Sequence, residues 1–163
     1  MTQFRALFLS LPLLLGAALA QAQGTAVPFG GFEADPTLPV EITADTLDVD
    51  QSTGAAEFKG NVLVGQGEMR LSAQRVLVIY NEEESAIERL EATGEVLLVN
   101  GEDAAEADRA DYTIDSGVIV MTGDVLLSQG PNVLSSQKMT VNLATGTAQM
   151  VGRVRTILNP EQE

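Results

Sequence analysis

From residue 40 onward, apolar and polar residues alternate along the chain, and glycines interrupt the alternation at intervals. In one such stretch Phe58, Val62 and Val64 share one parity, and Gly60 lies between them on the same parity. Successive side chains of a strand point to opposite faces, so this pattern predicts a half-buried strand. A glycine inside a strand indicates a bend or a bulge. We therefore expect kinked strands.

The pattern around Gly60 returns three times, at Gly94, Gly123 and Gly152. Each of these glycines is followed by one polar or charged residue and then by a valine. Self-similarity at a fixed spacing is the signature of a repeat architecture. The chain is therefore predicted to be a repeat protein whose strands bend at stacked positions.

Each repeat opens on a small residue, with further residues of one strand face three and five positions later. The openers and these pairs are Ala44 with Leu47 and Val49, Ala73 with Val76 and Val78, Ala107 with Ala110 and Tyr112, and Ser136 with Met139 and Val141. The second unit is longer, and its extra residues fall around the acidic loop Glu82–Glu84. Units of about 29 residues without a helical period predict an all-β stack of repeated two-strand units.

The ends of the chain differ in composition from this repeated region. Arg5, an apolar stretch over residues 6–20 and small residues near Ala20 and Ala22 predict a signal peptide over residues 1–22. A retained membrane anchor is the alternative. Residues 23–39 contain several glycines and prolines and predict a flexible leader. A β-domain over residues 40–158 and a short tail over residues 159–163 complete the predicted organisation.

Composition and charge narrow the function classes. With 23 acidic and 9 basic residues the formal net charge is −14, which repels nucleic acid. The chain contains no cysteine and no histidine, so it can form neither disulfides nor a histidine-based catalytic triad or zinc site. We therefore expect no nucleic-acid partner, no cofactor, no metal and no enzymatic activity.

Two groups of acidic residues are candidate sites. Asp45, Asp48 and Asp50 resemble the start of a calcium loop, but Lys59 stands where a bidentate glutamate is needed. A second group lies between Glu102 and Asp111 and contains enough carboxylates for glycoside hydrolysis. Acidic proteins offer such pairs by chance. We interpret the first group as a solvated strand edge and the second as a charged rim.

The apolar stripe of the strands is the stronger candidate site. Only 4% of the residues are aromatic and tryptophan is absent, so the stripe consists largely of slim side chains that suit lipid tails better than stacked sugars or bases. The opposite-parity positions Glu41, Lys59 and Asp111 are predicted to face outward. The predicted lipid-binding residues are Val40, Ile42, Val49, Phe58, Val62, Val64, Val78, Tyr112, Ile114, Met121 and Val141.

Several motifs occur in an order and at spacings that resemble the OstA-like family. The resemblance covers residues 40–158. No single motif is specific for the family, but the set of motifs in this order is a strong signal. The motifs are Phe58-Lys59-Gly60-Asn61-Val62, the segment 66–76, Ala107-Asp108 with Asp111-Tyr112, Met121-Thr122-Gly123-Asp124-Val125, and Gly152-Arg153-Val154. The acidic loop Glu82–Glu84 and the short tail depart from the family pattern.

This resemblance implies a twisted, slightly open antiparallel β-jellyroll in the periplasm. Its interior would hold the lipid A acyl chains of lipopolysaccharide, with sugars and phosphates outside. Members of the family associate head to tail and bridge an inner-membrane LptC to an outer-membrane LptD. The alternative is an exported structural β-stack that polymerises without a lipid ligand.

The physics of strand edges agrees with such assembly. An open array of strands has unpaired backbone groups at both ends, and these can dock another strand. Because the two ends are different surfaces, head-to-tail contact repeats without closing. We expect residues 40–43 and 152–158 to lie near opposite ends and to supply the docking edges.

Overall fold

The computed structural model describes residues 25–28, 35, 37–81 and 86–158. The predicted signal peptide, the acidic loop Glu82–Glu84 and the tail lie outside the described residues. Among the residues described, no helical segment has the length and apolar character needed to cross a bilayer.

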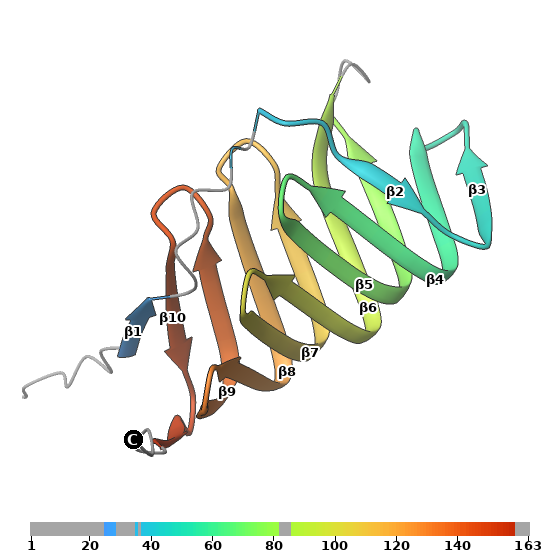
Figure 1. The fold of residues 1–163 in the computed structure, drawn as a ribbon. Coiled ribbons are helices and arrows are strands. Elements are labelled where there is room, and N and C mark those ends of the chain that lie inside the picture. The colour runs from blue at the N-terminus through green and yellow to red at the C-terminus, as the bar shows by residue number, and fades with distance from the viewer. Residues whose placement is uncertain (1–24, 29–34, 36, 82–85, 159–163) are drawn as a thin grey trace, which may run out of the picture.

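Every regular element of the described residues is a β-strand (Figure 1). The strands in chain order are β1 (Thr25–Pro28), β2 (Glu41–Thr43), β3 (Thr46–Asp50), β4 (Ala55–Gln66), β5 (Met69–Tyr80), β6 (Ile87–Asn100), β7 (Asp103–Thr113), β8 (Val118–Gln129), β9 (Asn132–Asn142), β10 (Thr147–Val151) and β11 (Arg155–Ile157). Strands β4 to β9 are long and follow one another in space as they do in sequence. The prediction of an all-β fold is confirmed.

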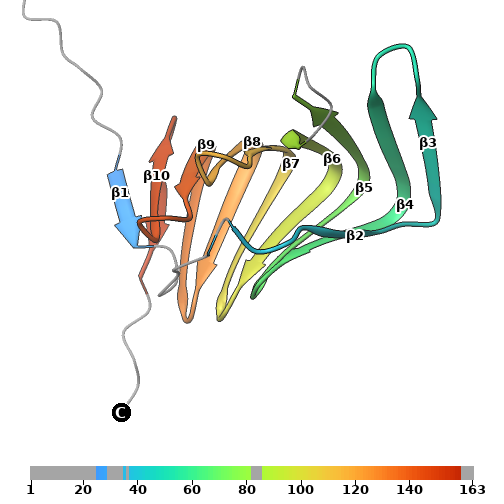
Figure 2. The ribbon, with the colours of Figure 1, turned by 90° about the horizontal axis from the view of Figure 1, so that it is seen from above.

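The strands form one antiparallel sheet that does not close on itself. Its order is β1-β10-β9-β8-β7-β6-β5-β4-β2, with β3 also paired to β4 and β11 also paired to β9. Figures 1 and 2 show β3 at one end of the stack and β10 with β1 at the other. The two predicted docking segments lie at opposite ends, in β2 and in β11.

Each predicted bend is a β-bulge. Gly60, Gly94, Gly123 and Gly152 have φ of +77°, +82°, +86° and +87°, and the residue after each also has positive φ. In β4, β6 and β8 the pairing register shifts at these points. Asn61 and Asp124 belong to the residue types that best tolerate the left-handed region, but Glu95 and Arg153 do not. The predicted stacking of kinks is confirmed.

A polar side chain from the neighbouring strand lies over each bulge glycine. These side chains are Asp45, Gln74, Asp108 and Gln137, each one residue after a predicted opener. A Cβ on Gly94 would lie 2.9 Å from Oε1 of Gln74, and one on Gly152 would lie 2.7 Å from Oε1 of Gln137. Glycine is therefore required both by backbone conformation and by space.

The sheet folds over along its length (Figure 2). Alternate side chains from both halves of the long strands belong to one core. We call this side the inner face and the opposite side the outer face. Burial alternates along the strands as the sequence pattern predicts, for example in β8, where Ile119 and Met121 are buried and Thr122 is partly exposed. The inner face is therefore continuous along the whole stack.

The leader contains an element that the sequence did not indicate. Residues 25–28 were predicted to be flexible, but they form β1, which pairs antiparallel with β10. Their composition lacks a strand pattern, yet β10 presents a free edge, and backbone pairing to an edge does not depend on side-chain alternation. The prediction of a flexible leader is thus wrong for these residues.

Candidate functional site

Rows of inner-face residues cross the sheet from one end to the other. Cross-strand partners connect each row, so a row is a contiguous line of side chains. The methionine row consists of Leu47, Phe58, Val76, Ala92, Ala110, Met121, Met139 and Met150. The tyrosine row consists of Val49, Ala56, Val78, Leu90, Tyr112, Ile119, Val141 and Ala148.

A third row lies on the other side of the bulges and faces the first two. This leucine row consists of Ile42, Val64, Leu71, Leu98, Ala105, Leu127 and Leu134. From Ile42 to Leu134 its side chains are all aliphatic, and all of them except Ile42 are buried, whereas the next cross-strand partner, Thr156 on β11, is polar and exposed. The three rows together form an apolar interior that runs the length of the stack.

Methionine is concentrated in this interior. The methionines on the described residues, Met69, Met121, Met139 and Met150, each have an exposed fraction of 0%. Met121, Met139 and Met150 are neighbours in one row. Methionine has an unbranched, flexible side chain that fills irregular spaces and repacks readily. Such an interior can rearrange around a guest chain at lower cost than one of branched residues.

One buried hydrogen bond links strands far apart in the sequence. The hydroxyl of Tyr112 on β7 donates to Oε1 of Gln66 at the end of β4, with an O–O distance of 2.5 Å. Nε2 of Gln66 in turn donates to the carbonyl oxygen of Leu38 at 2.9 Å. Burial raises the pKa of Tyr112 to about 12. We call these three residues the latch, because they tie the tip of β4 and the incoming chain to the middle of the sheet.

Polar residues occupy the inner positions at the tips of two hairpins. Asn100 and Asp103 are cross-strand partners at the tip of β6 and β7, and Gln129 lies beside Asp103 on β8. Nε2 of Gln129 donates to Oδ2 of Asp103 at 3.0 Å, and Asp103 is 8% exposed. Among the described residues, Nδ2 of Asn100 is buried without a hydrogen-bond partner. The interior therefore changes from apolar to polar at this lip.

The position of Asp103 corrects one prediction. The sequence predicts a charged rim for the acidic group between Glu102 and Asp111, which includes Asp103. Glu102 and Glu106 are exposed, but Asp103 lies inside. The residue follows the hairpin tip, where it shares the inner parity of Ala105 and Ala107.

Most of the predicted lipid-binding residues reach the interior. Buried members of the core are Val62, Val64, Val78, Tyr112, Met121 and Val141, and partly buried residues packed against the core are Val40, Ile42, Phe58 and Ile114. Val49 differs, because its exposed fraction is 62%. It belongs to the tyrosine row but lies on the terminal strand β3, which no further strand covers among those described. Val49 is therefore not enclosed in the single chain, and its role in lipid binding stays a prediction.

Several of the largest interior side chains are absent from the predicted lipid-binding set. Met69, Leu98, Ile119, Leu127, Met139 and Met150 are all fully buried. The repeat pattern already places Met139 on the same strand face as Val141, and Ile119 shares the parity of Met121, so strict use of the alternation includes both. Met69 follows a hairpin turn, where counting from the preceding strand fails.

The outer face combines ion pairs with exposed or partly exposed apolar side chains such as Leu63, Leu77 and Leu97. Nζ of Lys59 lies 3.0 Å from Asp48 and 2.7 Å from Glu57. Arg109 contacts Glu91 at 2.8 Å and Asp111 at 2.5 Å. Hydrogen bonds from Arg109 first, and from Arg89 second, lower the pKa of Glu91. The predicted outward positions Lys59 and Asp111 thus belong to this ionic surface.

The carboxylates considered for calcium have separate partners. Oδ2 of Asp45 accepts from Asn61 at 2.8 Å, Asp48 pairs with Lys59, and Oδ1 of Asp50 accepts from the backbone of Ser52 at 2.8 Å. Within the described part of the chain, no three potential metal ligands converge. The three carboxylates serve the bulge, the outer face and a turn.

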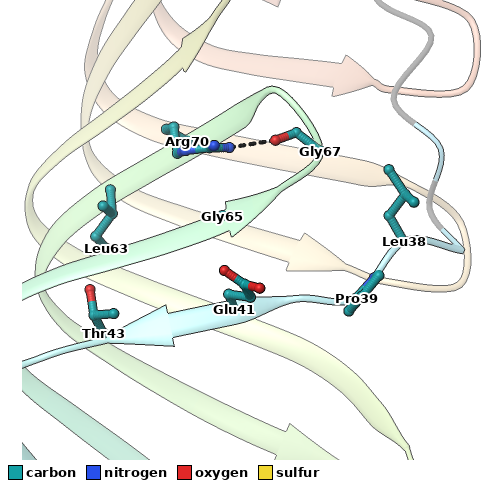
Figure 3. A pocket seen from close by; sticks show the side chains of 8 residues that line it. All are labelled: Leu38, Pro39, Glu41, Thr43, Leu63, Gly65, Gly67 and Arg70. Carbon is teal, nitrogen blue, oxygen red and sulfur yellow. Dashed lines mark hydrogen bonds between the residues drawn. The ribbon is translucent and has the colours of Figure 1, made fainter.

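A hollow on the outer face lies between β2 and β4 (Figure 3). Figure 3 shows the side chain of Arg70 turned along the hairpin tip, where Nη1 donates to the carbonyl oxygen of Gly67 at 2.6 Å. Glu41 and Thr43 line the same hollow. Their polar outer-face positions separate this hollow from the apolar interior.

An open antiparallel sheet, folded over an apolar interior with a polar lip, defines a β-jellyroll of the kind that can enclose an apolar ligand. Comparisons with known proteins agree with this class. Residues 41–147 match the family model described as "LptA/(LptD N-terminal domain) LPS transport protein". The chain therefore belongs to this family of lipopolysaccharide transport proteins.

Individual relatives support the assignment. An uncharacterized protein of Rhizobium meliloti (strain 1021) is 32% identical over 160 residues, covering 91% of this chain and 85% of the relative. The lipopolysaccharide export system protein LptA of Escherichia coli (strain K12) is 26% identical over 170 residues, covering 98% and 90%. The crystal structure of LptH from Pseudomonas aeruginosa superposes with a TM-score of 0.69 at 16% identity, over 78% of this chain and 99% of that one.

Proposed function

We propose that this chain is a periplasmic carrier that binds the acyl chains of lipopolysaccharide between the two halves of its folded sheet. In this role it forms part of a bridge from an LptC-like inner-membrane protein to an LptD-like outer-membrane protein. The observation that carries the proposal is the apolar interior, which is continuous across the sheet from β3 to β10. The family assignment favours this role over a structural stack without a ligand.

Burial of methylene groups supplies the affinity. Each buried CH₂ contributes about 0.8 kcal/mol, less the cost of displacing side chains that already fill the interior. Flexible methionines in the methionine row keep that cost low, because they change rotamers without leaving voids. Apolar contact has no preferred direction, so an acyl chain can move along the rows.

Separation of the two halves admits the ligand. The latch joins Tyr112 in the tyrosine row to Gln66 at the tip of β4, and the bond lies within the buried interior. A guest chain between these residues requires the bond to break. The polar lip at Asn100, Asp103 and Gln129 would then face the hydroxyl and amide groups where acyl chains join the sugar.

The charge of the protein favours a ligand whose acyl chains lie inside and whose phosphates lie outside. Acidic residues outnumber basic ones, and four of the basic side chains on the described residues are held in ion pairs on the outer face, namely Lys59, Arg75, Arg89 and Arg109. A ligand phosphate is therefore not strongly attracted to the protein surface, and the acyl chains remain the main handle. This arrangement permits release as well as capture.

Photo-crosslinking at adjacent positions tests the proposal. A photoreactive residue at Phe58 or Ile114, which are only partly buried, should capture lipopolysaccharide in cells. The same residue at the outer-face positions Glu41, Lys59 and Asp111 should capture little. Phe58 and Lys59 form a matched pair, because they are neighbours on opposite faces of β4. Equal labelling on both faces would contradict an interior binding site.

A further inference from the structure

Two strands of this chain fit the same place in the repeating sheet. β1 pairs with the free edge of β10, with Thr25 opposite Met150 and Val27 opposite Ala148. Within the stack, β5 lies on β4 in the same register, with Val76 opposite Phe58 and Val78 opposite Ala56. β7 on β6 and β9 on β8 repeat that register. β1 therefore occupies the position of a further repeat-opening strand.

β3 is the repeat-opening strand of the first unit. Leu47 and Val49 lie in the methionine and tyrosine rows, and the edge of β3 away from β4 has no neighbour among the described strands. If the sheet of one copy continued into the next, the strand placed on β10 would be the β3 of that next copy. Leu47 would then lie opposite Met150, and Val49 opposite Ala148. These are the positions that Thr25 and Val27 hold.

We propose that β1 is an internal cap that stands in for the β3 of a second copy, and that head-to-tail association requires β1 to leave β10. This inference rests on the proposed bridging function. The exposed residues of β3 supply a reason for exchange. Leu47 and Val49 are 52% and 62% exposed, and a neighbouring strand would cover both. β1 has four residues, and its last residue, Pro28, has no N–H to donate.

Charge at the junction also favours β3 of a second copy. Hollows on the outer face of the stack are each lined by residues of two successive repeats. One of these residues directly follows a bulge glycine, and the other directly follows the opener of the next repeat. One hollow is lined by Asn61 and Gln74, and the next by Glu95 and Asp108. In the same arrangement, Arg153 of one copy would meet Asp45 of the next. This pair of opposite charges would lie at the junction between copies.

The cap sets the concentration at which copies associate. A strand tethered to its own domain competes at an effective concentration in the millimolar range. Association of copies is therefore weak while β1 is in place and stronger once it is displaced. A bridge would form where copies are held close together, and copies free in solution would remain separate.

A disulfide lock tests the cap directly, because the chain contains no cysteine of its own. Ala26 and Gln149 are register partners, so Ala26→Cys with Gln149→Cys should join β1 to β10 on oxidation. In sedimentation velocity, the oxidised form should self-associate at least about tenfold more weakly than the reduced form. The matched control is Thr122→Cys with Lys138→Cys, a register pair inside the sheet, which should show no difference.

Release of the cap should have the opposite effect. Alternate N–H groups of a strand point to opposite edges, so only one of Ala26→Pro and Val27→Pro removes an N–H that faces β10. The variant that loses this N–H should associate about tenfold more strongly than wild type. The other of the two proline variants should show a smaller increase. Asp48→Cys in one copy and Gln149→Cys in another should then form an intermolecular disulfide, since Asp48 takes the place of Ala26.

The outcomes separate the cap from the proposed function. Oxidised and reduced lock variants that associate equally would overturn the cap, as would failure of the lock to oxidise. If no variant associates at any concentration, head-to-tail bridging fails together with the cap. Lipid capture at Phe58 is measured on the oxidised lock variant as well and should persist there, because the interior is unchanged.

Discussion

The inner and outer faces of the same strands differ in what they need from their neighbours. Met121 on the inner face is completely buried among apolar residues, whereas its neighbour Thr122 on the outer face lies between Arg109 and Lys138 in register. On the outer face the charged residues form ion pairs with fixed partners, such as Arg109 with Glu91, beside apolar residues such as Leu63. Inner-face contacts are non-directional and can be replaced by an acyl chain. The difference shows how a rigid sheet can carry a deformable site.

A charge placed on either face should give the largest difference. Met121→Asp buries a carboxylate without a partner and is expected to destabilise the fold by more than about 4 kcal/mol. Thr122→Asp places the same group between two cations and should change the unfolding free energy by less than about 1 kcal/mol. Urea denaturation of both variants measures the two effects. A folded, stable Met121→Asp protein would mean that water reaches this part of the interior.

A smaller loss of stability is expected at a bulge glycine. Gly123→Ala forces a side chain into a backbone with φ of +86° and against the carboxylate of Asp108, and should cost about 1–3 kcal/mol. Gly101→Ala is the control, because Gly101 also has positive φ but has no heavy atom within 4 Å of the added Cβ. The difference between the two melting curves isolates the contact with Asp108. Equal losses would show that only backbone strain matters.

The latch should contribute less than the bulge, and its contribution should depend on pH. Tyr112→Phe removes the hydroxyl that donates to the buried Oε1 of Gln66 and is expected to cost about 1–2 kcal/mol. Burial raises the pKa of Tyr112 to about 12, above its unfolded value near 10. Its contribution is therefore present below about pH 10 and is lost as the pH rises toward about 12.

Stability measured against alkaline pH tests this expectation. Wild-type protein should lose stability over that interval, and Tyr112→Phe should lose less. The variant should also load lipid faster, since the two halves separate more easily. Slower loading would mean that the hydroxyl contacts the ligand and does not hold the groove closed.

The smallest effect belongs to the outer ion pairs. Hydrogen bonds from Arg109 and Arg89 lower the pKa of Glu91, so its contribution is present above its unfolded pKa and is lost as the pH falls. Glu91→Gln should reduce stability at neutral pH by less than about 1 kcal/mol and flatten the loss below about pH 4.5. Glu88→Gln, at an exposed position on the same strand, is the control. A loss as large as that of Gly123→Ala would show that the outer face holds the fold.

Periodicity predicted the fold because the repeat is local. Gly60, Gly94, Gly123 and Gly152 mark the bulges in the sequence itself, and the parity of Phe58 and Val62 follows from the alternation. Features that depend on contacts between residues far apart in the sequence were not predicted. The bond between Tyr112 and Gln66 joins residues 46 apart, and no local pattern indicates it.

End effects explain the other differences. Val49 has the right parity but is exposed, because burial requires a strand on both sides. Asp103 lies in the sequence close to exposed acidic residues. Its inward orientation follows only from its place in the alternation that starts at the hairpin tip. β1 forms because an edge is available to it, which the composition of residues 25–28 does not reveal.

The central claim is that the apolar interior holds acyl chains while the outer face does not bind the sugars. Native mass spectrometry of the protein, mixed with lipopolysaccharide or with the same molecule after chemical removal of its acyl chains, tests it directly. We expect a complex with the acylated form and none with the deacylated form at equal concentration. Equal binding of the two forms would contradict an interior binding site for acyl chains, because recognition would then lie in the sugars and phosphates.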